Sequence, residues 1–116
     1  MIAVIFEVTP HANKKANYLD VAAEMRPLVD KIDGFLSVER FQSLTNPEKL
    51  LSLSFFRDEE ALNEWRNLTE HRRAQKLGRS SYFKDYRLRI AHVMRDYGLE
   101  EREQAPEDSR ALHGDS

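Results

Sequence analysis

The chain has 116 residues, which is enough for one domain with a single core and too few for two. Hydrophobic residues make up 41% and charged residues 33%, a composition that excludes a disordered chain. No apolar run approaches the ~18 residues that span a bilayer, which excludes a membrane protein. The absence of cysteine excludes disulfides, thiolate catalysis and zinc–thiolate sites. The first eight residues have no basic segment of a signal peptide, so we expect a cytoplasmic protein.

The first predicted element is a strand at residues 2–9, a nearly continuous apolar run rich in β-branched side chains. Pro10 ends it. A helix should follow from Asn13, a predicted N-cap, to a stop at Gly34. Its apolar positions recur at spacings of four, three, four and three: Tyr18, Ala22, Met25, Val29 and Ile32. Pro27 lies inside this pattern and predicts either a kink near residues 23–26 or two abutting helices.

A hairpin is expected next. Residues 35–44 alternate as a strand, with Leu36, Val38 and Arg40 on one side. The turn letters TNPEK separate it from a partner strand at residues 50–56, whose one side carries Leu51, Leu53 and Phe55.

A second helix is predicted from its N-cap, Asp58. Leu62, Trp65 and Leu68 form its apolar stripe, and Thr69 can start the helix again. The last strand covers residues 82–94, where alternation puts one set of side chains on one face: Tyr86, Leu88, Ile90, His92 and Met94.

The order βαββαβ predicts a ferredoxin-like α+β fold, a four-stranded antiparallel sheet with both helices on one face. The other face carries apolar side chains and has no cover within the chain. An apolar sheet face in water is unfavourable, so we expect a homodimer in which two sheets pack face to face.

The last segment differs from the rest. Residues 98–116 hold six acids and two arginines, which gives −4 and leaves +2 for residues 1–97. Only Leu99 and Leu112 are large aliphatic residues there, too little apolar area to offset the entropy of ordering. We therefore expect one domain at residues 1–97 and an acidic, disordered tail at residues 98–116.

Two stretches resemble the antibiotic biosynthesis monooxygenase domain family: IDGFLSVERFQSL and LLSLSFFRDEEALNEWRNLTEHRRAQ. The shared features are a Gly-Phe turn before the second strand, an aromatic-acidic end of the third strand, and a helix with Trp ahead of the letters EH. The resemblance covers about residues 1–97. It implies a dimeric α+β barrel and, for some members, oxidation of quinols or polycyclic phenols by O₂ without metal or flavin.

Other members of the family degrade haem. The resemblance implies for them an asparagine on the first strand, a tryptophan on the second helix and a histidine ten residues later as the iron ligand. Trp65 matches, but the first strand offers Phe6 or Glu7 instead of asparagine, and the position ten after Trp65 is Gln75. We therefore expect no haem and no other cofactor.

Trp65 and His71 are the candidate catalytic pair. Six residues turn a helix by ~240°, so on a continuous helix the two side chains do not share a face. They meet only if the helix breaks between Asn67 and Thr69. Trp65 is then either a core anchor or a platform for a flat phenolic substrate. The platform reading adds an aromatic pocket formed with Phe6, Phe55 and Phe83.

Gln75 lies one turn after His71 on the predicted helix. There His71 can orient a phenol or accept its proton, because imidazole titrates near neutral pH. The alternative is an exposed His71 among Arg72, Arg73 and Lys76. Arg79 or Arg87 is expected near the mouth of the pocket, where it favours an anionic ligand.

Basic residues also gather between Arg66 and Arg95, nine against two acids. Their alternation on the last strand, their spread around the helix and a pI near 6.1 are atypical of nucleic-acid binding. No histidine and carboxylate spacing indicates a metal site.

Two hypotheses remain: a small cofactor-independent monooxygenase acting on a phenol or quinol, and a non-catalytic dimer that binds a small aromatic ligand or serves as a scaffold.

Overall fold

The computed structural model describes residues 1–77 and 81–113. Four strands form one antiparallel sheet in the order β2-β3-β1-β4. They are β1 (Ile2–Pro10), β2 (Phe35–Gln42), β3 (Leu50–Phe56) and β4 (Phe83–His92). The two central strands, β1 and β3, are separated in the chain by the helix and strand between them, as the ferredoxin-like order requires.

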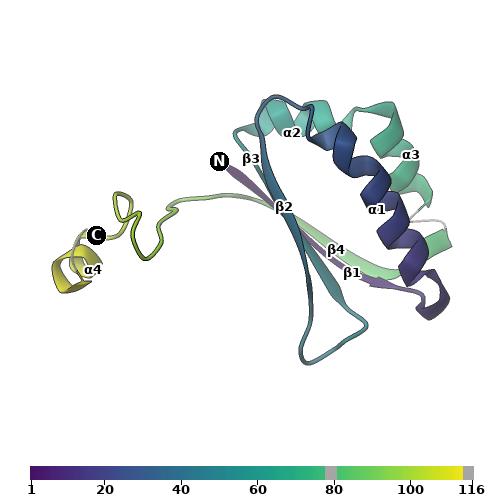
Figure 1. The fold of residues 1–116 in the computed structure, drawn as a ribbon, viewed down its shortest axis with the longest axis horizontal. Helices are drawn as coiled ribbons and strands as arrows, with labels where there is room; N and C mark the ends of the chain where they lie inside the picture. Colours follow the sequence, from purple (N-terminus) through teal and green to yellow (C-terminus); the bar gives the residue numbers. More distant parts are fainter. Residues whose placement is uncertain (78–80, 114–116) are drawn as a thin grey trace.

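The helices lie on one side of this sheet, apart from the one in the tail. The helical elements are η1 (Ala12–Lys14), α1 (Lys15–Val29), α2 (Glu59–Arg66), α3 (Thr69–Leu77) and α4 (Glu107–His113). Figure 1 shows α1, α2 and α3 together on one face, and α4 well away from the sheet. The ferredoxin-like α+β fold expected from the sequence is confirmed.

Strand register assigns the two faces. Ile2, Val4, Phe6 and Val8 pair across to Phe56, Ser54, Ser52 and Leu50 on β3, and all of these face the helices. Ile5, which pairs with Leu53, lies on the opposite face, because successive side chains of a strand point to opposite sides. No helix of the described residues covers that opposite face (Figure 1).

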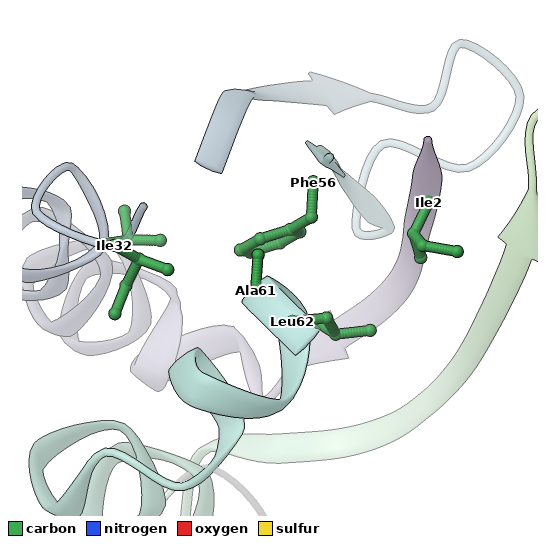
Figure 2. Packing of buried hydrophobic residues seen from close by; sticks show 6 residues of the cluster. Ile2, Ile32, Phe56, Ala61 and Leu62 are labelled. Carbon is green, nitrogen blue, oxygen red and sulfur yellow. The ribbon is translucent and has the colours of Figure 1, made fainter. Parts of the chain in front are cut away.

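Two separate clusters make up the hydrophobic core. The first joins β1, α1, β3 and α2, and its buried members are Ile2, Val29, Ile32, Phe56, Ala61 and Leu62. Figure 2 shows the Phe56 ring of β3 close to Ala61 and Leu62 of α2. The second cluster consists of Val8, Tyr18 and Leu50, with Phe6 and Phe83 packed against it. The helices are therefore fastened to the sheet in two places.

Asp58 caps α2 as the sequence predicts, whereas Gly34 does not end the first helix: α1 ends at Val29, and Gly34 lies in the turn before β2. The Asp58 carboxylate accepts a hydrogen bond from the Ala61 N–H at 2.9 Å, which satisfies a free donor at the start of α2. Gly34 has φ of +94°, a conformation that strains any other residue. A Cβ there would also lie 2.8 Å from the Ala61 Cβ, so glycine allows the turn before β2 to approach α2.

The start of α1 differs from the prediction, and of the two alternatives at Pro27 the one with two abutting helices is wrong. The chain first forms the 3-10 turn η1, α1 begins at Lys15, and Asn13 is not its N-cap. The helix then runs unbroken through Pro27. Proline lies in the last turn, where it removes one hydrogen bond, and burial of Val29 and Ile32 against the first cluster holds that turn in place.

The tail has local structure of its own. Ala105 is buried, and Arg102 donates hydrogen bonds to the Gly98 carbonyl and the Ser109 hydroxyl. These contacts join residues within the tail, which extends away from the sheet (Figure 1). The disorder of residues 98–116 therefore stays a prediction.

Across the two described ranges, no helix has the length and apolar character to cross a membrane.

Candidate functional site

A cavity of about 1180 Å³ lies between the helices and the helix-facing side of the sheet. Its floor is formed by side chains of all four strands, and its walls come from α1, α2, α3 and the start of β4. The cavity therefore occupies the space that the two core clusters leave between them.

Small side chains on a central strand create this space. On β3 the residues between Leu50 and Phe56 that face the helices are Ser52 and Ser54. Neither fills the volume that a Leu or Phe would fill, so the helices stand over a hollow instead of a packed layer. On the edge strand β4, Leu88 and Ile90 line the cavity and are each 47% exposed.

Four aromatic rings close one end of the cavity. Phe83 lies 5.6 Å from both Phe6 and Tyr18 between ring centroids, and Tyr86 is 5.8 Å from Phe6. All four rings belong to the cavity lining. These centroid distances are typical of tilted and edge-to-face aromatic pairs, which form a stiff apolar wall.

Trp65 and His71 meet in another wall. Helix α2 ends at Arg66 and α3 begins at Thr69, so the chain breaks where the sequence required a break for the two side chains to converge. The imidazole and indole rings stack with centroids 4.2 Å apart and an angle of 19° between their planes. Trp65 also packs against the first core cluster, so it is a core anchor and a cavity wall together.

The environment of His71 fixes its charge. Burial lowers the pKa of its imidazole to about 4, and the positive charges of Arg66 and Arg72 act in the same direction. Its Nδ1 lies 3.2 Å from the Trp65 carbonyl oxygen. That oxygen can only accept, so Nδ1 carries the proton of the neutral ring and Nε2 retains a lone pair. His71 is therefore a neutral hydrogen-bond acceptor at pH 7.

Most of the predicted site residues gather at this cavity. Its lining includes His71, Trp65, Phe6, Gln75 and Phe83. Their catalytic and substrate-binding roles stay predictions. The placement of His71 among exposed cations is wrong, since its side chain is half-buried against Trp65.

Two further predicted residues do not join them. The placement of Phe55 in the pocket is wrong: it pairs with Ala3 and Ser37 on the other face of the sheet, and Phe56 lines the cavity instead. The two phenylalanines are adjacent, so a shift of one position in the assigned face exchanges them. Arg79 lies outside the described residues.

Arg40 is a cavity residue that sequence reasoning did not select. It lies on β2 opposite Ser52, and its guanidinium is 5.9 Å from the centroid of the Tyr18 ring. The available signal was its alternation with Val38, which put an arginine on an otherwise apolar side of the strand.

Within residues 1–77 and 81–113, no group of three or more His, Asp or Glu side chains is arranged to hold a metal ion.

Comparison with known proteins assigns the fold to a family. Residues 1–77 match the sequence profile of the family described as antibiotic biosynthesis monooxygenase. The structure of Rv0793 from Mycobacterium tuberculosis superposes with a TM-score of 0.74 at 15% identity, covering 84% of this chain and 98% of that one. At that identity the likeness extends to the fold alone.

Two curated relatives are more similar in sequence. A protein of Pyricularia oryzae named jasmonate monooxygenase ABM is 44% identical over 93 residues, which are 80% of this chain and 43% of the relative. An uncharacterized Bacillus subtilis protein, YqjZ, is 33% identical over 93 residues, 80% of this chain and 79% of the relative. The chain thus spans less than half the length of the Pyricularia protein.

Proposed function

Because the chain belongs to the antibiotic biosynthesis monooxygenase family, we propose that it is a monooxygenase that oxidises a small phenol or quinol with O₂ in the cavity under α2 and α3. The observation that carries the proposal is the stacked pair of Trp65 and His71 in a wall of that cavity. The pair offers an aromatic surface and a hydrogen-bond acceptor side by side. A flat hydroxylated ring needs both.

The role of Trp65 follows from its partial burial. The indole packs against the first core cluster and stacks on His71, so the ring is fixed and loses little entropy when a substrate contacts it. Phe6 and Phe83 supply apolar contact at the aromatic end of the cavity. Gln75 lines the same cavity and can donate to a second oxygen of the substrate.

The low pKa of His71 selects between its two proposed roles. Full proton transfer from a phenol of pKa ~10 to an imidazole with a pKa of about 4 is uphill by roughly 8 kcal/mol. His71 is therefore assigned to orient the hydroxyl, with Nε2 accepting its hydrogen bond. The hydroxyl proton and one electron then pass together to O₂, giving an aryloxyl radical and HO₂•, so His71 does not have to take up the proton.

In this proposal the substrate supplies the electrons and no haem, flavin or metal takes part. One oxygen atom enters the ring system and the other leaves as water. Jasmonic acid is included as a second substrate to test, because the Pyricularia relative bears its name. Its hydroxylation consumes two electrons that the acid does not supply, so that assay contains an added two-electron reductant, a reduced nicotinamide.

The low pKa of His71 also favours a second candidate function: a non-catalytic dimer that binds a small aromatic ligand. A cavity wall whose histidine is a weak base is suited to binding without proton transfer. The two candidates share the cavity and differ in turnover.

We further propose that the protein is a homodimer in which two uncovered sheet faces pack together. That face carries the half-buried side chains of Ile5, Leu51, Leu53 and Phe55. Its Glu7 carboxylate is bonded to Lys49 at 3.1 Å and to Arg89 at 2.6 Å, so charge on the face is partly compensated within one subunit. An apolar face with paired charges suits a contact between copies.

O₂ uptake by metal-stripped protein tests the monooxygenase. The panel is a set of quinols, phenols and jasmonic acid, with the wild type, Trp65→Phe, His71→Ala and His71→Gln. Uptake that needs substrate and falls about 10²-fold in His71→Ala, but less in His71→Gln, supports the proposal. The matched control is His92→Ala, since His92 is exposed on β4 and does not line the cavity.

The contrary outcomes are distinct. Saturable quenching of Trp65 fluorescence without uptake for any member of the panel selects the non-catalytic binder. Uptake that requires added haem, together with a sharp Soret band that disappears in His71→Ala, overturns the cofactor-independent mechanism.

A further inference from the structure

The charged side chains around the cavity indicate which chemical groups its ligand carries. Of the described residues that line it, five are basic and one, Glu59, is acidic. The basic ones are Arg26, Arg40, Arg66, Arg72 and Lys76. An excess of positive charge over a low-dielectric hollow raises the local concentration of anions.

The basic side chains differ in their partners. Arg26 is bonded to the Asp30 carboxylate at 2.9 Å, and Arg72 donates to the Asn67 side-chain oxygen. Within the described part of the chain, Arg40 has no carboxylate and no side-chain oxygen in bonding distance. Its guanidinium lies over the face of the Tyr18 ring. Its guanidinium donors are therefore available to a ligand.

The sheet register places Arg40 at the polar end of the cavity floor. One row across the sheet, from β2 to β4, is Arg40, Ser52, Phe6 and Leu88. The next row is Val38, Ser54, Val4 and Ile90. Neighbouring strands are ~4.8 Å apart, so the floor extends roughly 14 Å from β2 to β4. The guanidinium and the two serine hydroxyls lie at the β2–β3 side, and the β1–β4 side is apolar.

We propose that the ligand of this cavity carries a carboxylate in addition to its ring, and that Arg40 is the residue that selects it. The carboxylate lies on the Arg40 guanidinium beside Ser52, and the ring extends over Phe6 toward Leu88 and Ile90. Guanidinium binds carboxylate through two parallel hydrogen bonds, which gives both affinity and orientation. The inference rests on the proposed function only for the identity of the cavity as the substrate site.

Binding without turnover tests it. Phenylacetate and cyclopentylacetate are each titrated beside their methyl esters under nitrogen, with Trp65 fluorescence and calorimetry as readouts. The chain has one tryptophan and it lines the cavity, so the signal is local. Wild-type protein is expected to bind at least one acid about tenfold more tightly than its ester.

Variants assign the preference to a residue. Arg40→Gln should reduce the acid-to-ester ratio to about twofold, and Arg40→Lys should give an intermediate ratio, because it keeps the charge and loses the paired geometry. Arg66→Gln is the matched comparison, because it removes another cavity cation, on α2. The ratio should fall less in Arg66→Gln than in Arg40→Gln, because only Arg40 is proposed to make the paired hydrogen bonds.

Three results overturn the inference: no saturable binding of any of the acids, an unchanged ratio in Arg40→Gln, or an equal loss in Arg66→Gln. Near-ultraviolet circular dichroism establishes that each variant is folded. The two proposals fail independently. A preference for acids that depends on Arg40, without any O₂ uptake, refutes the monooxygenase and supports this inference. Quinol turnover with equal binding of acids and esters supports the monooxygenase and refutes this inference.

Discussion

The His71 imidazole stacks on the Trp65 indole across the break between α2 and α3, with centroids 4.2 Å apart and Nδ1 3.2 Å from the Trp65 carbonyl oxygen. The contact joins the end of one helix to the start of the next. It also desolvates the imidazole, which lowers the pKa of His71 to about 4. One pair of side chains thus contributes both a structural joint and a cavity wall.

This pKa predicts a pH dependence of stability. In the unfolded chain His71 titrates near 6.5, so between pH 6.5 and 4 the unfolded state binds more protons than the folded state. Stability from this group is complete above pH 6.5 and is lost as pH falls toward 4. The loss by pH 5 is roughly 2 kcal/mol. Urea unfolding at pH 7.5 and pH 5, for wild type and His71→Gln, measures it.

His71→Gln keeps a side-chain amide that can donate to the Trp65 carbonyl and does not titrate. Its unfolding free energy should therefore fall less than that of the wild type over the same interval. His92→Gln is the control, because that side chain is exposed and should reproduce the wild-type slope. Equal slopes in wild type and His71→Gln would contradict a buried neutral His71.

The Asp58 cap predicts a stability effect at the start of α2. Asp58→Ala leaves the Ala61 N–H without its acceptor and should lower the free energy of unfolding by about 1 kcal/mol. Asp58→Asn retains an acceptor oxygen and should lose about half as much or less. Denaturant unfolding with both variants separates the cap from the lost charge and from the contact with Arg57. An Asn variant as unstable as the Ala variant would assign the effect to charge.

The Gly34 turn predicts strong intolerance of a side chain. Gly34→Ala combines a positive φ with a Cβ 2.8 Å from that of Ala61, so we expect a loss of about 2 kcal/mol or more. Gly98→Ala is the comparison, because its Cβ would meet only the flexible end of Glu101 at 3.2 Å, and its effect should remain within about 0.5 kcal/mol. Thermal unfolding of the two variants tests the difference.

The proposed dimer predicts an effect at Leu53. Leu53→Lys puts a charge at the centre of the uncovered face and should shift light-scattering mass from a dimer to the 13.6 kDa monomer at micromolar concentration. Leu44→Lys is the control, since Leu44 is 98% exposed in the β2–β3 connection. A wild-type protein that is monomeric in the same experiment refutes the dimer directly.

Several features followed from short-range patterns. The strand at residues 2–9 and the cap at Asp58 depend on side-chain alternation and on one hydrogen bond to a neighbour three residues away, which local sequence specifies. The restart at Thr69 is equally local. At Pro27 the alternative of two abutting helices is wrong, because α1 is one helix from Lys15 to Val29, and the kink stays a prediction.

The amino-acid sequence by itself determined the order of the elements, because hydrophobic periodicity and turn residues act over a few positions. Only the tertiary structure decided that Phe56, not Phe55, faces the helices, because pairing with β1 and β2 sets which side of β3 is buried. It alone brought His71 onto Trp65 and placed Arg40 over the cavity floor. Those contacts join residues on separate elements, and burial, which sets the charge of His71, exists only once the elements have packed.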